Sequence, residues 1–74
     1  MEYFKATKLI RSEVKNNYVY VRDLEKGGVI DALLTDSQVK KVSSVLQQIT
    51  DESFTVVWDL LKSIKGVKFT YSSY

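Results

Sequence analysis

The chemistry open to this chain is limited first by two residue types that it lacks, histidine and cysteine. Their absence removes the commonest general base, a common nucleophile and the usual ligands of transition metals. Carboxylates are present but scattered: Asp23, Glu25, Asp31, Asp36, Asp51, Glu52 and Asp59. No glycine-rich loop follows a strand-like segment in the pattern that cradles a phosphate. We therefore expect a protein that is not an enzyme and that uses no cofactor and no metal ion.

The residue types best suited to binding are tyrosine and the basic side chains of the first third of the chain. Residues 18–21 are β-branched and aromatic, which predicts a strand. In a strand Tyr18, Tyr20 and Arg22 share one face, while the two valines between them share the other. Cations predicted to join the same face are Lys5, Arg11, Lys15 and Lys68.

Two binding functions fit this basic, tyrosine-bearing face. Bases stack on aromatic rings and cations meet phosphates, so the face suits single-stranded nucleic acid. The same face could also bind another protein. A third interpretation is that tyrosines and long cations only cover an exposed sheet face. A register slip of one residue would turn both tyrosines inward.

A second candidate surface lies on a predicted helix that follows Thr50. Its apolar residues are Phe54, Val56, Val57, Trp58, Leu60, Leu61 and Ile64. At 100° per residue they span an arc of about 200°, so the helix needs cover on a second side. Either the rest of the fold provides that cover, or Val56 and Leu60 form a seam with a second copy or another protein.

The elements that position these residues can be read from capping and periodicity. Thr35 and Gln38 have the spacing of a capping box and predict a helix start, and Thr50 predicts the next. We expect Gly66 just beyond the end of that second helix, near Lys65. A helix-turn-helix is disfavoured because the polar arc of the second helix holds two carboxylates.

Strands are predicted on both sides of the helices, at residues 3–14, 18–21, 28–34 and 67–71. The first of these segments also fits a helix, but a turn at Lys15–Asn17 favours a strand. The predicted order is β-β-β-α-α-β, an α+β fold in which two helices pack on one face of a small antiparallel sheet.

Composition is that of an ordinary globular protein, with 45% hydrophobic and 27% charged residues, and 74 residues predict a single domain, 1–74. Net charge is +2, with five basic and two acidic residues among the first 22. Because no apolar run could span a membrane and no signal peptide is recognisable, we expect a cytoplasmic protein with no membrane partner. If the chain is viral, that cytoplasm is the host's.

These observations favour a non-catalytic macromolecule-binding protein. We expect a small accessory factor or inhibitor, of the kind that phages and viruses encode, whose partner is another protein and which forms a homodimer. The alternative is a nucleic-acid-binding protein that uses the basic, tyrosine-bearing sheet face.

Overall fold

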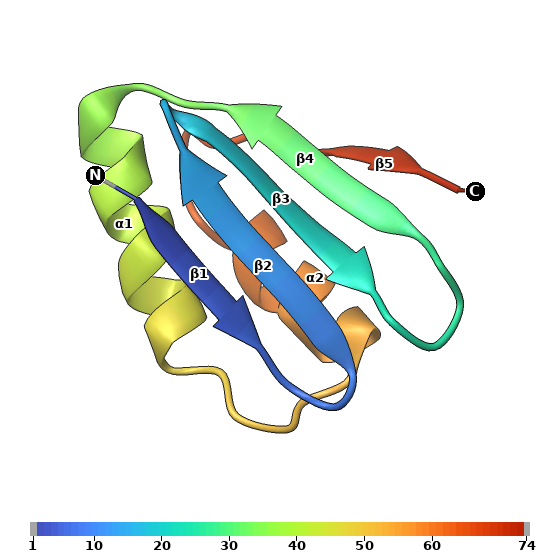
Figure 1. Ribbon diagram of the computed structural model, residues 1–74. Helices are drawn as coiled ribbons and strands as arrows, with labels where there is room; N and C mark the ends of the chain where they lie inside the picture. The colour runs from blue at the N-terminus through green and yellow to red at the C-terminus, as the bar shows by residue number, and fades with distance from the viewer. Residues whose placement is uncertain (1, 74) are drawn as a thin grey trace.

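A computed structural model describes residues 2–73 of the chain (Figure 1). Within these residues the element order is ββββααβ. The elements are β1 (Tyr3–Ala6), β2 (Ile10–Lys15), β3 (Tyr18–Asp23), β4 (Val29–Leu33), α1 (Asp36–Gln47), α2 (Phe54–Lys62) and β5 (Thr70–Ser72).

The five strands form one antiparallel sheet in the order β1-β2-β3-β4-β5. Both helices lie behind this sheet in Figure 1, and the opposite face is turned toward the viewer without a helix on it. The predicted class, an α+β fold with two helices on one face of an antiparallel sheet, is confirmed.

Residues 3–14 form two strands rather than the single strand that we predicted. The chain reverses after Ala6, where the Thr7 hydroxyl accepts hydrogen bonds from the backbone N–H groups of Leu9 and Ile10, both at 3.1 Å. The Thr7 N–H donates in turn to the Ile10 carbonyl at 2.8 Å. Because a turn interrupts the strand, the side-chain alternation of β1 does not carry over into β2.

Helix α1 begins where the sequence predicts. The Thr35 hydroxyl accepts a hydrogen bond from the Gln38 N–H at 3.3 Å, and the Gln38 side chain accepts one from the Thr35 N–H at 2.9 Å. This reciprocal pair is the predicted capping box.

Helix α2 begins later and ends earlier than predicted. Its N-cap is Ser53 rather than Thr50, and its last residue is Lys62. Thr50 instead donates its hydroxyl and its N–H to the Glu52 carboxylate, within the segment that connects the helices. Gly66 lies beyond the helix with φ of 84°, the left-handed conformation expected of it.

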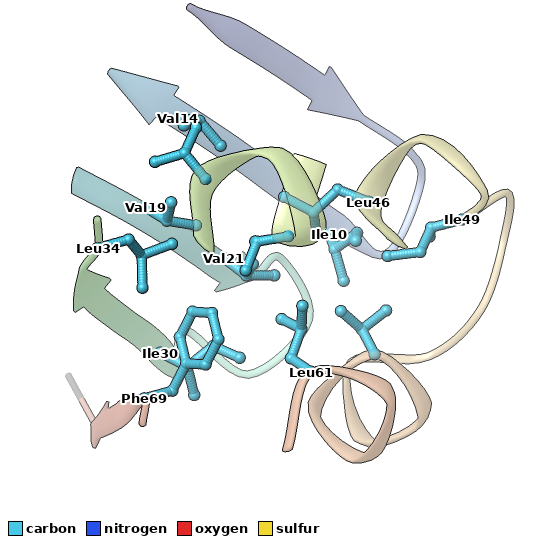
Figure 2. Packing of buried hydrophobic residues seen from close by; sticks show 13 residues of the cluster. Ile10, Val14, Val19, Val21, Ile30, Leu34, Leu46, Ile49, Leu61 and Phe69 are labelled. Carbon is cyan, nitrogen blue, oxygen red and sulfur yellow. The ribbon is translucent and has the colours of Figure 1, made fainter. Parts of the chain in front are cut away.

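The hydrophobic core fills the space between the inner face of the sheet and the two helices. Figure 2 shows Ile10 and Val21 of the sheet pointing toward Leu46 and Leu61 of the helices. The buried cluster consists of Ile10, Val14, Val19, Val21, Ile30, Leu34, Val39, Val42, Leu46, Ile49, Val57, Leu61 and Phe69. Because this cluster takes its strand residues from the inner face, the side chains of the other face are left for solvent or a partner.

Candidate functional site

The candidate site is the sheet face that carries no helix, which we call the outer face. On β2 and β3 buried and accessible residues alternate, so every second side chain points outward. The predicted residues that the structure brings together on it are Arg11, Lys15, Tyr18, Tyr20 and Arg22. The tyrosine positions follow from the period of two in β3, and no register slip turns them inward.

Lys5 does not belong to this face, and its predicted position there is wrong. It pairs across the sheet with Ser12, which is fully buried on the side of the helices. Its ammonium donates a hydrogen bond of 3.1 Å to the carbonyl of Gln47, the last residue of α1. A cation at a helix C-terminus interacts favourably with the helix dipole, so Lys5 has a structural role.

Lys68 is exposed, but it precedes β5 rather than lying in a strand. The last strand begins at Thr70, three residues later than the predicted start at Val67. Phe69, beside Lys68, is part of the core. Lys68 is therefore placed at the margin of the sheet rather than among the clustered residues of β2 and β3.

The two tyrosine hydroxyls of the outer face are held by carboxylates of neighbouring strands. Tyr18 donates to Asp31 of β4 at 2.7 Å, and Tyr20 donates to Glu13 of β2 at 3.0 Å. The two rings lie with their centroids 6.4 Å apart at an angle of 41°. Each tyrosine is thus fixed at its hydroxyl while its ring remains at least partly accessible.

Charges of both signs surround the Tyr20 hydroxyl. Burial, the hydrogen bond to Glu13 and the negative charge of that residue raise the pKa of Tyr20 above its ordinary value. The positive charges of Arg11 and Arg22 act in the opposite direction. The outer face is therefore a mixed surface of aromatic rings, cations and carboxylates, rather than a purely basic one.

Two large, exposed apolar residues of the outer face were missed in the sequence. Leu33, opposite Tyr18, has 79% of its surface exposed, and Phe4, opposite Glu13, has 53% exposed. The Arg11 guanidinium lies over the Phe4 ring, 4.9 Å from its centroid. Alternation along β4 could have placed Leu33 on this face, whereas Phe4 required knowledge of the turn after Ala6.

Comparison with family models, with curated proteins and with solved structures finds no match to this chain. Among residues 2–73 no three acidic side chains come together in a group that could hold a metal ion. No helix of the described chain is long and apolar enough to cross a membrane.

The second predicted surface lies on α2. Val56 and Leu60 have 44% and 43% of their surfaces exposed, while Val57 and Leu61 of the same helix are fully buried. The helix thus packs on the sheet through one side of its apolar arc, and the edge at Val56 and Leu60 remains accessible.

An aromatic cluster that sequence reasoning missed occupies the other flank of α2. The Tyr71 ring of β5 makes edge-type contacts with Phe54 at 6.4 Å and with Trp58 at 6.3 Å. The Lys62 ammonium lies 5.3 Å from the centroid of the Trp58 ring. These contacts join α2 to the last strand of the sheet, and the alternation of residues 67–71 could have indicated Tyr71 as a helix-facing residue.

Proposed function

We propose that this chain is a non-catalytic protein-binding protein, an accessory factor or inhibitor that occupies the surface of another protein through its outer sheet face. The observation that carries the proposal is the pair Tyr18 and Tyr20, each held by a carboxylate on an uncovered sheet. Tyrosine and arginine are enriched in protein interfaces, where a few of them supply most of the binding energy.

The fixed hydroxyls support a role in binding for an energetic reason. A side chain that is ordered before association loses less conformational entropy when the partner arrives. Tyrosine has only two side-chain torsions, and in this protein a hydrogen bond already restricts each ring. Exposed Leu33 of β4 and Phe4 of β1 add apolar area to the same surface.

Nucleic-acid binding is the second candidate function. Arg11, Lys15 and Arg22 favour it, because exposed cations on one face attract phosphates. Glu13 and Asp31 oppose it, because they lie beside the tyrosines on which bases would stack. A protein surface offers both donors and acceptors and can match such a mixed face, so a protein partner is favoured.

For the exposed edge of α2 we propose a second copy of the chain as the occupant. Val56 and Leu60 lie four residues apart and therefore one above the other on the helix surface. A patch on a two-fold axis meets its own copy, and two small aliphatic patches of this kind are self-complementary. In this arrangement the homodimer leaves both outer faces free.

The test is capture of partners from a cytoplasmic lysate of the source cell, with and without nuclease. Wild-type protein is compared with the double variants Tyr18→Ala/Tyr20→Ala and Val56→Ala/Leu60→Ala. We expect a defined protein that survives nuclease, is lost with the tyrosine variant and is retained with the α2 variant.

Three other outcomes would overturn the proposal. Recovery of nucleic acid alone, with an affinity that falls steeply with salt, would establish the second candidate function. Loss of the partner only with the Val56→Ala/Leu60→Ala variant would move the binding surface to α2. Unchanged binding by both variants would exclude both surfaces.

A further inference from the structure

Two arginines occupy directly opposite positions on the outer face of the sheet. Arg11 of β2 and Arg22 of β3 are directly opposite in the register of the sheet, and both are exposed. Like charges at such positions destabilise a sheet, because their side chains start only about 5 Å apart. This like-charge pair lies on two inner strands that are paired on both sides, near the end of the sheet where β2 begins and β3 ends.

The carboxylates beside the pair are hydrogen-bonded to the tyrosines and, within the described residues, form no salt bridge with either arginine. Glu13 accepts a hydrogen bond from Tyr20, and Asp31 accepts one from Tyr18. Within residues 2–73, the salt bridge that the structure contains joins Lys62 to Asp59 on α2 and involves neither arginine. The guanidinium of Arg11 is instead positioned over the Phe4 ring.

These features give the pair the properties of a prepared anion site. The Phe4 ring restricts the Arg11 side chain through a cation–π contact without satisfying its hydrogen-bond donors. A guanidinium presents several N–H donors in a plane and binds a carboxylate through two of them at once. An anion that contacted both guanidinium groups would also reduce the repulsion between them.

We propose that Arg11 and Arg22 together form a carboxylate-binding site of the outer face, and that they recognise an acidic segment of a partner protein. This inference rests on the proposed function, and it adds the chemistry of the partner: closely spaced Asp or Glu side chains that dock beside Phe4.

The arrangement of charge on the neighbouring positions favours a protein over a nucleic acid as the source of the anion. Glu13 and Asp31 flank Tyr20 on β2 and β4, so the three form a cross-strand row next to the arginine pair. Positions two residues apart along a strand are separated by about 7 Å. A continuous phosphate backbone that contacted the arginines would pass close to this acidic row, whereas a protein can present a carboxylate to one row and hydrogen-bond donors to the next.

The probe for this site is a capped tetraglutamate peptide, with capped tetraglutamine as the neutral control. Titration of isotope-labelled protein is followed by NMR on the side-chain Nε–H signals of the arginines. We expect saturable shifts of Arg11 and Arg22 with tetraglutamate and none with tetraglutamine. The variants Arg11→Gln and Arg22→Gln should each lower the affinity for tetraglutamate about three- to fivefold, as the loss of an exposed charge pair does.

The matched control is Lys40→Gln, which removes an exposed cation from α1 and should leave the affinity unchanged. Equal shifts at the helix lysines, or an equal loss with Lys40→Gln, would show nonspecific attraction and overturn the proposal. Tighter binding of a thymidine oligonucleotide than of tetraglutamate, lost in the same arginine variants, would reassign the site to phosphate.

Failure of this inference can be told apart from failure of the proposed function. A captured protein that requires Tyr18 and Tyr20 but is retained by the Arg11→Gln/Arg22→Gln variant would sustain the function and overturn the carboxylate site. Peptide binding by the arginines without any captured protein would sustain the site and overturn the function.

Discussion

The Tyr20 hydroxyl lies near charges of both signs, and these charges act on its pKa in opposite directions. Burial and Glu13 raise its pKa, so the folded state favours the neutral phenol. The corresponding stabilisation is present below the pKa of tyrosine in the unfolded chain, near 10, and is lost as pH rises through the higher folded value. Glu13→Gln should lower the pKa of Tyr20, and Arg22→Gln should raise it further, because each removes one of these charges.

The measurement is a pH titration of the Tyr20 ring carbon that carries the hydroxyl, followed by NMR. Glu25→Gln, which removes an exposed carboxylate between β3 and β4, is the control and should have no effect on this titration. Shifts of the same sign for Glu13→Gln and Arg22→Gln would contradict the charge arrangement.

At the residue scale, the sequence predicted orientation only where one strand continues without interruption. Tyr18, Tyr20 and Arg22 alternate strictly with buried residues in β3, so a period of two was sufficient. Lys5 was misplaced because the turn after Ala6 breaks the alternation between β1 and β2. The carboxylate partners of the tyrosines depend on register between strands, which the sequence of one strand does not contain.

At the scale of elements, local signals predicted α1 better than α2. Thr35 and Gln38 satisfy each other within one turn, so the start of α1 is decided locally. Thr50 and Ser53 both have the side chain of an N-cap, and the choice between them depends on tertiary structure. Ile49 is buried in the core, and Thr50 is bonded to Glu52, which leaves Ser53 to begin α2.

The turn between β2 and β3 depends on the side chain of Asn17 as well as on its backbone conformation. Asn16 and Asn17 have φ of 52° and 66°, as a two-residue hairpin loop of type I′ requires. The Asn17 side chain also donates to the Leu34 carbonyl at 3.0 Å and to Asp36 at 2.8 Å, which ties the hairpin to the start of α1. Asn17→Gly loses these bonds alone, whereas Asn17→Ala also places an alanine in the left-handed region.

We expect Asn17→Gly to lower the free energy of unfolding by about 1 kcal/mol, and Asn17→Ala by about 2–3 kcal/mol. Urea denaturation measures both, and Asn16→Gly, whose φ glycine adopts freely, serves as the control without loss. Equal losses for the two Asn17 variants would mean that the positive φ carries no cost. Wild-type stability of Asn17→Gly would mean that the two side-chain bonds contribute nothing.

At the scale of the whole molecule, the two proposed surfaces lie on opposite sides of the sheet. The outer face is turned toward the viewer in Figure 1, and α2 lies behind it. Association through α2 and binding through the outer face therefore do not compete for the same surface. A homodimer of this kind would present two outer faces and gain avidity for a partner with repeated sites.

The exposed edge of α2 should make the chain self-associate. We expect the mass of the wild-type chain in light scattering to rise with concentration toward that of a dimer. The exposed Val56 and Leu60 of one copy would bury the same two residues of the other copy. Val56→Glu/Leu60→Glu should raise the dimer dissociation constant about tenfold or more, since it places like charges across a two-fold axis. Both positions are exposed in the monomer, so the variant should still fold.

Thr55→Glu, on another side of the same helix, controls for added charge and should dimerise like wild type. A wild-type chain that stays monomeric at high concentration would refute the seam and leave the exposed edge of α2 to a different protein.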